Sequence, residues 1–411
     1  MARFLLPRTI TQRVPHARGL RSALTLTVIL AACLQGGCRT EQPWPLWDNY
    51  AKSAIDAQGR VIDHSAGDRT TSEGQAYAMF FALVANDRSR FDRLLSWTET
   101  NLAGGDLTLH LPAWSWGKSP DGAWKVLDPN PAADSDLWIA YDLLEAGRLW
   151  RDPRFERLGN LLATRIAHQE VVLIPGLGTT LLSGAVGFHP DDSTWILNPS
   201  YFPPFILAHL AKLQPTGPWA AVLDSLDPML ADGSAGGFAM DWVTAGNSGI
   251  RPGLSPQQRT ALNKLDAPLQ DSKLDTTPIG SYDAIRVYLW LGLADPATPG
   301  VHSLLSRVNG MAAYLKTQVT PPQIVDSAGR IVDTNAPPGF SAAVVPYLTA
   351  LGLKSQARVQ MDRLSATKDP SSGLYGKGSL YYDQNLALFA TGWTEQRFHF
   401  DKEGKLITRW K

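Results

Sequence analysis

The chain has 411 residues, with 38 basic and 38 acidic side chains and no long run of like charge. This balance excludes the basic surface of a nucleic-acid-binding protein and gives no reason to expect binding to an anionic membrane surface. Length and composition are those of a globular protein with a large core. Tryptophan is the exception, at 14 residues, and several of these lie in Gly- and Pro-rich connections where core packing explains them poorly.

Residues 1–40 have the pattern of an export signal. Arginines at positions 8, 13, 18 and 21 precede an apolar stretch, Ala23 to Ala32, that is too short to span a bilayer. Both cysteines of the chain, Cys33 and Cys38, lie in this segment, so the remainder needs no disulfide. Leu30 to Cys33 resembles a bacterial lipoprotein cleavage box, which would leave Cys33 with a lipid anchor in the membrane. The alternative is ordinary signal cleavage. Either way, we expect an exported protein, periplasmic or secreted.

From residue 41 to residue 411 the sequence predicts a single domain built from two kinds of helix. Six segments are apolar on all sides and must be buried, and they begin near Glu73, Asp134, Ser200, Asp283, Phe340 and Tyr381. Six amphipathic segments begin near Pro43, Phe91, Arg154, Pro218, His302 and Gln356. The two kinds alternate along the chain, which indicates two concentric layers. We therefore predict an all-α fold, an (α/α)6 barrel of six inner and six outer helices.

The connections between these helices contain short β-structure. Residues 55–63 are predicted to form a tight turn with short flanking strands, and residues 325–333 echo this segment. Residues 395–410 alternate in polarity and predict a terminal β-hairpin. Residues 233–278 are rich in Gly, Ser and Pro and are predicted to be a long loop, with one weak helical patch at residues 257–265.

The first buried helix begins with a carboxylate. Ser72, with a glutamine three residues later, fits the capping-box pattern, and the apolar run Ala76 to Ala85 follows. Glu73 would lie in the first turn, where acidic residues are favoured simply by the partial positive charge of the helix N-terminus. The same arrangement recurs at Asp134 and Asp283. If all inner helices run in the same direction, the three carboxylates meet at one end of the barrel.

The remaining residue types restrict the chemistry. The eight histidines lack metal-ligand spacing, and no serine-nucleophile, phosphate-loop or dinucleotide motif is found, so we expect no metal and no cofactor. Carboxylates at a cleft remain, and two of them suit acid/base hydrolysis of a glycosidic bond. Aromatic rings in the connections or at helix starts offer flat surfaces for the C–H faces of sugars, and they include Trp114, Trp116, Trp124, Trp195 and Tyr201. Trp138 and Trp150 are expected in the core instead.

Three motifs resemble those of family 8 glycoside hydrolases: Thr71 to Met79, Ala133 to Ala140 and Ser281 to Arg286. Pro175 to Gly178 and Asn198 to Tyr201 narrow the resemblance to the periplasmic endoglucanases of bacterial cellulose-synthesis operons. The resemblance covers nearly all of the chain after the leader. It implies an inverting endo-β-1,4-glucanase that cleaves internal bonds of cellulose. It also implies a β-1,4-glucan chain as substrate and the cellulose synthase or secretion complex as a partner.

The resemblance also implies a role for each carboxylate. Glu73 is the expected general acid, Asp283 is the expected base that activates water, and Asp134 is expected to hold or distort the sugar at the cleavage point. An older assignment for the family would make Asp134 the nucleophile. The motif around Asp134 departs from the usual family pattern by having Ala133 and Ser135, which are both small.

Five further site residues are implied by the same resemblance. Tyr282 and Arg286 are expected beside the base, and Trp114, Trp116 and Tyr201 are expected to be sugar platforms.

Physical consistency adds an expectation about ionisation. A general acid must keep its proton near neutral pH, whereas a helix N-terminus favours the ionised form. We therefore expect Asp134 to lie close to Glu73 and to help raise its pKa, and Asp283 to stand apart near Arg286 and stay ionised. Inversion requires carboxyls roughly 6.5–9.5 Å apart, whereas retention requires about 5–5.5 Å. We predict the wide spacing for Glu73 and Asp283.

Two alternatives stay open at this point. Family 8 resemblance also covers xylanases, lichenases and chitosanases, although cationic chitosan would favour more acidic residues along the cleft. From a different class, the chain could be a non-catalytic glucan-binding protein of the cellulose secretion machinery. Such a protein would need neither Glu73 nor Asp283.

Overall fold

The computed structural model describes residues 43–263 and 276–411, and Trp44 to Arg409 form one unit. The predicted export signal at residues 1–40, with Cys33 and Cys38, lies outside the described residues. Within the described ranges, no helix combines the length and the apolar character that crossing a bilayer requires.

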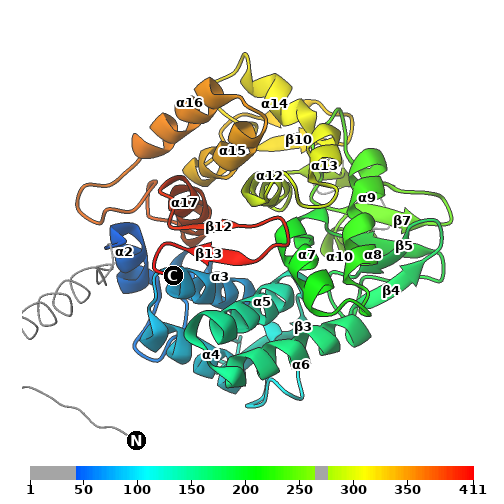
Figure 1. Ribbon diagram of the computed structural model, residues 1–411. Helices are drawn as coiled ribbons and strands as arrows, with labels where there is room; N and C mark the ends of the chain where they lie inside the picture. Colours follow the sequence, from blue (N-terminus) through cyan, green and yellow to red (C-terminus); the bar gives the residue numbers. More distant parts are fainter. Residues whose placement is uncertain (1–42, 264–275) are drawn as a thin grey trace, which may run out of the picture. The chain divides into compact units, whose positions relative to one another are not determined.

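Six helices form an inner ring, and almost every residue in them is buried. They are α3 (Ser72–Val84), α5 (Ala133–Trp150), α7 (Pro204–Leu213), α12 (Ala284–Leu293), α15 (Pro338–Ala350) and α17 (Tyr381–Thr394). Figure 1 shows them arranged around a common centre. Their sequences have no polar face, which is why each must be enclosed by neighbours.

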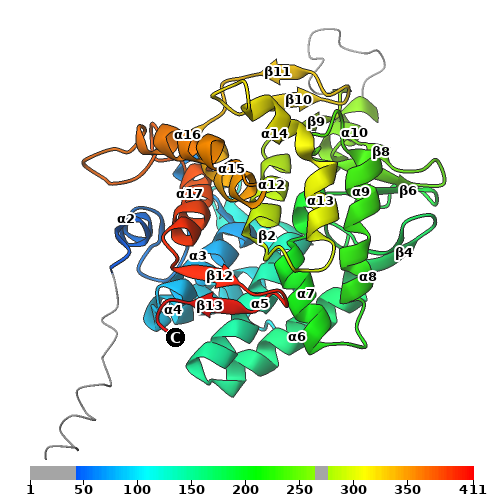
Figure 2. The ribbon, with the colours of Figure 1, turned by 45° about the horizontal axis from the view of Figure 1, so that its top comes forward.

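An outer ring of amphipathic helices surrounds the inner one (Figures 1 and 2). It consists of α2 (Pro45–Ala54), α4 (Arg88–Leu102), α6 (Pro153–Gln169), α8 (Trp219–Asp224) with α9 (Leu226–Gly233), α13 (Val301–Arg307) with α14 (Asn309–Leu315), and α16 (Lys354–Ser365). Two of the six outer positions are thus occupied by a pair of short helices. Across the described residues, the order of inner and outer helices is the predicted one, and the (α/α)6 barrel is confirmed.

Aromatic side chains fill the centre of the inner ring. Trp138 of α5 and Trp290 of α12 have ring centroids 5.3 Å apart. Phe389 of α17 lies 5.2 Å from Trp138 and 5.1 Å from Trp290. All three side chains are almost fully buried. Three inner helices are therefore joined at one aromatic cluster, and Trp138 belongs to the core as predicted.

Helix α3 begins at Ser72, but its cap differs from the prediction. Thr71 is the N-cap, and its hydroxyl accepts a hydrogen bond from the N–H of Gly74 at 3.1 Å. Gln75 does not close a capping box. Its buried amide hydrogen-bonds backbone groups of the turn at residues 55–63 and of helix α4. A buried amide must find partners, and here those partners lie in neighbouring segments rather than at the cap.

Three turns share the sequence Asp-x-x-Gly and one geometry. In each, an aspartate Oδ1 accepts the backbone N–H groups of the residues two and four positions later, and the aspartates are Asp56, Asp326 and Asp401. The glycine three positions after each aspartate has a φ of +96°, +76° or +74° respectively, which other residues adopt only with strain. The first two turns are the segments whose sequences echo one another, so the predicted repeat is a repeated turn.

The third of these turns connects the two strands of the predicted C-terminal hairpin, β12 (Phe398–Phe400) and β13 (Leu406–Thr408). Phe400 stacks on Phe205 of α7 with ring centroids 3.9 Å apart. Arg148, in the last turn of α5, donates to the carbonyl of Leu406 at 2.6 Å. The hairpin therefore covers the end of the barrel at which α5 ends, and it lies across the inner ring in Figure 1.

Small sheets line the opposite end, where several inner helices begin. One consists of β1 (Thr70–Thr71), β2 (Ala113–Lys118) and β3 (Trp124–Pro131), and another of β9 (Ile279–Gly280), β10 (Ile324–Asp326) and β11 (Ile331–Asp333). The strands β4 (Val171–Ile174) and β5 (Gly178–Leu181) pair with each other. The 3₁₀ helices η1 (His64–Ala66) and η2 (Pro199–Tyr201) complete the connections.

The predicted long loop at residues 233–278 contains more structure than expected. Strand β7 (Val243–Gly246) pairs with β6 (Thr194–Leu197) and β8 (Arg251–Pro252). Helix α10 (Pro256–Asn263) lies at the predicted helical patch, and residues 264–275 are outside the described ranges. All four residues of β7 are buried, so the strand lacks the polar alternation by which a sequence reveals it.

Candidate active site

Three inner helices bring their carboxylates to one arginine, Arg286, in the first turn of α12. Its Nη1 lies 2.8 Å from Oδ2 of Asp134 and also contacts Oε2 of Glu73. Its Nη2 lies 2.7 Å from Oδ1 of Asp283. Glu73 is in the first turn of α3, Asp134 is in the first turn of α5, and Asp283 is the N-cap of α12. The predicted meeting of the three carboxylates is therefore confirmed.

The guanidinium supplies the positive charge for this cluster. Arg286 is the only charged residue in an otherwise apolar helix, and its side chain is 3% exposed. A charge at such a site must be paired, and the planar guanidinium offers several donors to several acceptors at once. Within residues 43–263 and 276–411, no group of three or more His, Cys, Asp or Glu side chains has the arrangement of a metal site.

The four side chains of the cluster differ in their exposure. Glu73 and Asp283 are 21% and 31% exposed, whereas Asp134 and Arg286 are 5% and 3% exposed. A molecule entering from solvent therefore reaches Glu73 and Asp283 first. Asp134 and Arg286 lie behind them.

Burial raises the pKa of Glu73 to about 7. The Arg286 guanidinium opposes this shift, and the negative charges of Asp134 and Asp283 add to it. The expectation that Asp134 lies close to Glu73 is confirmed, since both bind the same nitrogen. Its charge is nevertheless a smaller cause than burial. A carboxyl with this pKa holds its proton at slightly acidic pH although it stands at a helix N-terminus.

Asp283 lies beside Arg286, as predicted, but Arg286 also holds the other two carboxylates. Asp283 binds the second terminal nitrogen of the same guanidinium. Burial raises its pKa, while Arg286 lowers it and the charge of Asp134 raises it further. One arginine can hold all three carboxylates because its guanidinium fork offers several donors to separate acceptors. That Asp283 stays ionised remains a prediction.

The use of two guanidinium nitrogens has a geometric consequence. Glu73 contacts Nη1 and Asp283 contacts Nη2, so the arginine stands between the two carboxyls. This arrangement suits a separated pair, although the predicted spacing of roughly 6.5–9.5 Å stays a prediction.

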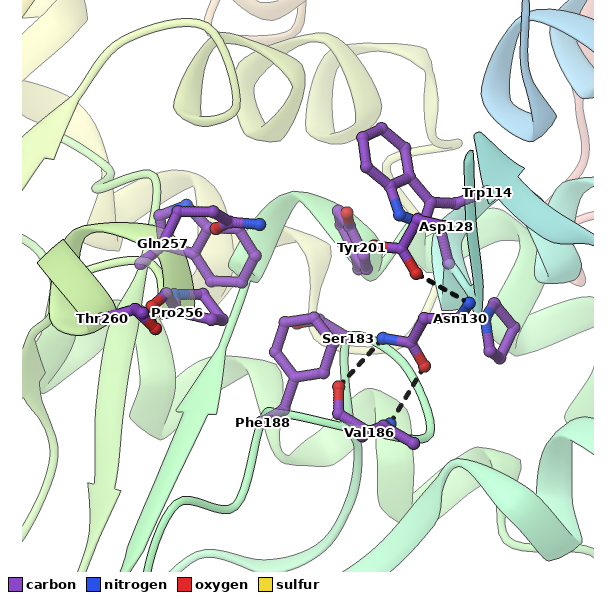
Figure 3. Close-up of a pocket in the computed structure, with 13 residues that line it drawn as sticks. Trp114, Asp128, Asn130, Ser183, Val186, Phe188, Tyr201, Pro256, Gln257 and Thr260 are labelled. Carbon is purple, nitrogen blue, oxygen red and sulfur yellow. Dashed lines mark hydrogen bonds between the residues drawn. The ribbon is translucent and has the colours of Figure 1, made fainter. Parts of the chain in front are cut away.

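A cavity of about 680 Å³ adjoins the cluster. It is lined by Trp114, Asp128, Asn130, Pro131, Ala132, Ser183, Val186, Phe188, Tyr201, Trp242, Pro256, Gln257 and Thr260. Figure 3 shows Trp114 and Tyr201 on one side and Pro256, Gln257 and Thr260 on the other. Tyr201 joins the cavity to the cluster, because the guanidinium carbon of Arg286 lies 5.6 Å from the centre of its ring. The lining is mainly aromatic and apolar, with a few polar groups.

Two of the three predicted sugar platforms, Trp114 and Tyr201, thus line this cavity. Trp116 is not among the lining residues. Its ring stacks on Trp124 at 5.2 Å and 22°, and it contacts Trp97 edge-on at 5.4 Å. The guanidinium carbon of Arg60 lies 4.5 Å from the centre of the Trp116 ring. The role of Trp116 as a platform stays a prediction.

Tyr282, predicted beside the base, is 48% exposed. Its ring packs against Phe340 and Tyr382, with centroids 5.2 and 5.9 Å away. Its carbonyl accepts a hydrogen bond from the Tyr382 hydroxyl at 2.6 Å. Tyr282 directly precedes Asp283 in the sequence. Its contact with substrate stays a prediction.

Several residues of the site were not predicted from the sequence. The hydroxyl of Tyr77 lies 3.3 Å from Nη1 of Arg286. Tyr77 follows Glu73 by four positions on α3, so the helical spacing could have placed it beneath the carboxylate. Asn130 exchanges two hydrogen bonds with the backbone of Val186, at 2.9 and 3.0 Å, as Figure 3 shows. No sequence motif joins these two distant segments, and the same holds for the stacked pair of Phe188 and Trp242.

The profile described as "Glycosyl hydrolases family 8" matches residues 20–396. The chain belongs to glycosyl hydrolase family 8. An endoglucanase of Xanthomonas axonopodis pv. citri (strain 306) is 41% identical over 401 residues, which cover 97% of each chain. An endoglucanase of Escherichia coli (strain K12) is 40% identical over 393 residues, which cover 95% of this chain and 97% of that one.

Solved structures agree with this assignment. The crystal structure of endo-1,4-D-glucanase from Vibrio fischeri ES114 superposes with a TM-score of 0.75 at 34% identity, and the alignment covers 90% of this chain and 99% of that one. The resemblance inferred from the three motifs is confirmed. The barrel of this family 8 chain is that of its relatives.

Replacing Arg286 by methionine removes the cation that contacts all three carboxylates. Because the change leaves buried negative charge uncompensated, we expect the free energy of unfolding at pH 7 to fall by about 3–5 kcal/mol. Without the cation, the pKa values of Glu73 and Asp283 rise in the folded state, because Arg286 lowers both. Stability is then regained as the pH falls toward the unfolded values of about 4, and the deficit shrinks at pH 5. Urea unfolding at both pH values measures the effect.

Arg307→Met is the matched control. Arg307 pairs with Asp227 at 2.9 Å, and the two side chains are 42% and 36% exposed. An exposed pair of this kind contributes no more than about 1 kcal/mol. A loss in Arg286→Met no larger than that in Arg307→Met would show that the cluster is not held by its arginine.

Trp114→Ala tests the aromatic wall of the cavity. The ring offers a flat apolar surface, so its removal is expected to raise KM for long cello-oligosaccharides more than for short ones. Steady-state kinetics across chain lengths measures this. Leu213→Ala is the control, since Leu213 at the end of α7 is 47% exposed and is not among the residues that line this cavity. An equal rise in KM at every length would contradict a stacking role.

Proposed function

We propose that this family 8 protein is an endo-β-1,4-glucanase that hydrolyses internal bonds of cellulose by an inverting acid/base mechanism. The observation that carries the proposal is the position of Glu73 and Asp283. Both are partly exposed, on separate nitrogens of one buried guanidinium, beside an aromatic cavity. The endoglucanases at about 40% identity support it. Release of reducing ends from carboxymethylcellulose tests the activity, and a folded protein that releases none would favour the glucan-binding alternative.

Glu73 is proposed to be the general acid. Its pKa of about 7 leaves it protonated over the acidic to neutral range. In the transition state its proton passes to the glycosidic oxygen, the bond from the anomeric carbon to that oxygen breaks, and the departing sugar leaves as an alcohol. Burial thus raises the pKa of Glu73, whereas the helix N-terminus alone would lower it.

Asp283 is proposed to be the base. Contact with Arg286 favours its anionic form against the effect of burial. In that form it accepts a proton from a water molecule while the water oxygen bonds to the anomeric carbon on the face opposite the departing oxygen. One proton is taken up by Asp283 as one is given up by Glu73, so the pair returns to its starting state after a proton exchange with solvent.

Asp134 is proposed to hold the sugar at the cleavage point. Its side chain is only 5% exposed, and hydrogen bonds from Arg286 and Ser135 fix its orientation. Such a fixed acceptor can bind a sugar hydroxyl and favour a distorted ring, which lowers the barrier to cleavage.

The cavity supports an uncharged polymer as substrate. Its walls carry Trp114, Tyr201, Phe188 and Trp242, and its polar groups are few. Aromatic rings bind the apolar faces of glucose units with little loss of side-chain entropy. A chain that extends beyond the cavity on both sides would be cut internally, which is the endo mode of action.

A more specific biological setting is also proposed. The motifs at Pro175 to Gly178 and Asn198 to Tyr201 support an association with bacterial cellulose biosynthesis, with the synthase or secretion complex as partner. The residues before position 41 support export to the periplasm or beyond, either as a soluble product or with a lipid on Cys33. The mass of the mature N-terminal peptide distinguishes these alternatives, since a lipid on Cys33 adds mass that ordinary signal cleavage does not.

Inversion predicts the configuration of the first product. Because water attacks opposite the departing oxygen, hydrolysis of a β-1,4 bond is expected to give the α-anomer initially. Proton NMR during the first minutes of cello-oligosaccharide hydrolysis measures it before mutarotation. A β-anomer as first product would remove the water-activating role from Asp283 and would favour the assignment of Asp134 as a nucleophile.

The pKa of Glu73 predicts the alkaline limit of activity. As the pH rises through about 7 the acid loses its proton, so kcat/KM is expected to fall on the alkaline side from about that pH.

Glu73→Gln is expected to lower kcat by roughly 10²–10⁴-fold. The matched control is Glu156→Gln, which alters an exposed first-turn carboxylate of α6. Unchanged turnover by folded Glu73→Gln would reduce Glu73 to a helix-terminal charge.

A further inference from the structure

Asp283 stands at a position where an aspartate usually caps its own helix. At an N-cap, the side chain normally accepts a hydrogen bond from a backbone N–H of the first turn. Asp283 is the N-cap of α12, but its side chain makes no such bond. Its carboxylate is directed to Nη2 of Arg286 instead, at 2.7 Å. Ile285 and Arg286 donate their N–H groups to the backbone carbonyls of Ser281 and Asp283, each at 3.0 Å. The N–H of Ala284, the first residue of α12, therefore needs an acceptor from another segment.

Asp241 provides that acceptor from a distant part of the chain. Its Oδ1 accepts hydrogen bonds from the backbone N–H groups of Ser281 at 2.7 Å, Asp283 at 3.2 Å and Ala284 at 2.8 Å. These groups lie on both sides of the Asp283 Cα. One oxygen thus fixes the backbone that carries the base.

The segment that carries Asp241 is itself held in place by the region around α12. The N–H of Asp241 donates to the carbonyl of Ile279 at 2.8 Å. The hydroxyl of Tyr288, on α12, accepts from the N–H of Ala239 at 2.9 Å. Gly280 permits this approach, since a Cβ there would lie 2.1 Å from the carbonyl oxygen of Ala239. The position of Asp241 is therefore determined from several sides.

Asp283 is also close enough to Asp241 to affect its ionisation. Burial raises the pKa of Asp241 to about 7, the negative charge of Asp283 adds to this, and the three N–H groups oppose it. Asp241 is not among the residues that line the cavity, although its neighbour Trp242 is. It therefore borders the site without being part of the cavity wall.

We propose that Asp241 is a positioning residue for the base. By accepting the three N–H groups around Asp283, it takes over the helix cap and leaves the Asp283 carboxylate free to face Arg286 and an attacking water. The inference rests on the proposed function, because it presupposes that Asp283 is the base. It adds a requirement for the reaction that none of the three family motifs contains.

The alternative is that Asp241 only stabilises the fold. The two roles differ in what a substitution does to folded protein. A purely structural cap changes the melting temperature and the folded fraction, whereas a positioning residue changes kcat per folded molecule. A displacement of the base by about 1 Å is sufficient to cost roughly 10²-fold in rate.

The experiment compares Asp241→Asn with Asp241→Ala. Asparagine keeps a carbonyl oxygen at the Oδ1 position and can accept the same three bonds, whereas alanine accepts none. For Asp241→Ala we expect kcat on cello-oligosaccharides to fall roughly 10²-fold with KM little changed. For Asp241→Asn we expect most of kcat to be retained. Circular dichroism and thermal melting of each variant give the folded fraction by which kcat is corrected.

A second substrate assigns the defect to the base side of the reaction. A dinitrophenyl cello-oligosaccharide releases a phenolate that needs no proton, so it relieves the loss of a general acid but not that of a base. We expect Glu73→Gln to recover activity on this substrate. Asp241→Ala is expected to stay as impaired as on natural oligosaccharides.

Asp401 offers a matched control at the far end of the barrel. Its Oδ1 accepts two backbone N–H groups, those of Glu403 at 2.9 Å and Lys405 at 3.0 Å, in the terminal hairpin. Asp401→Ala removes the same kind of acceptor from a turn outside the site. We expect its kcat per folded molecule to equal that of the wild type.

The outcomes separate this inference from the proposed function. Wild-type kcat in folded Asp241→Ala, or a loss in Asp241→Asn as large as in Asp241→Ala, overturns the positioning role. If Asp241→Ala does not fold, Asp241→Glu moves the acceptor by one methylene, and an undiminished kcat there overturns it equally. Wild-type turnover in Asp283→Asn removes the base assignment itself, whatever Asp241 does.

Discussion

The contact of one buried guanidinium with three carboxylates is the interaction on which the rest of the site depends. Arg286 stands where the N-terminal ends of three inner helices meet, and without it Glu73, Asp134 and Asp283 would be like charges in a partly desolvated space. The barrel supplies the geometry, because parallel inner helices bring their first turns together although these are remote in sequence. The positive charge of the arginine offsets the repulsion between the three carboxylates. A lysine would supply a charge but not a planar fork with separate donors for separate acceptors.

The first turns of these inner helices have to satisfy two conflicting requirements. A first turn needs acceptors for its free N–H groups, and the nearest carboxylate would normally supply them. In α3 the conflict is resolved locally, because Thr71 caps the helix and leaves Glu73 free. In α12 it is resolved from a distance, because Asp241 provides the cap and leaves Asp283 free. In both helices, the residue proposed for chemistry is released from capping by another side chain.

Much of the fold could be predicted from the sequence because it follows from one physical requirement. A helix without a polar face must be enclosed, so the alternation of enclosed and half-exposed segments determined the double ring. Details that depend on contacts between distant segments could not be predicted. Strand β7 is buried along its whole length, so its pattern resembles a loop or a core segment. The cap role of Asp241 depends on the approach of Ala239 to Gly280, and no spacing in the sequence reports it. The site followed a similar division. The carboxylates lie at predicted helix starts and Trp114 and Tyr201 are predicted rings, whereas the places of Asn130 and Trp242 depend on contacts between distant segments.

The electrostatics of the cluster show why position alone does not decide the chemistry of a carboxyl. Glu73 and Asp283 both lie at helix starts, both touch Arg286, and burial raises the pKa of both. Arg286 lowers the pKa of each carboxyl against the effect of burial, and the neighbouring groups then determine the net shift. Glu73 shares its nitrogen with Asp134, so its negative form is disfavoured by a second anion at the same donor. Asp283 has the other nitrogen, and no second carboxylate is seen on that donor among the described residues. Asn198 also forms a side-chain hydrogen bond with Asp283, which lowers the pKa of that carboxyl. The two carboxyls on one guanidinium thus differ in their hydrogen-bond partners, although the charge of Asp134 raises the pKa of both.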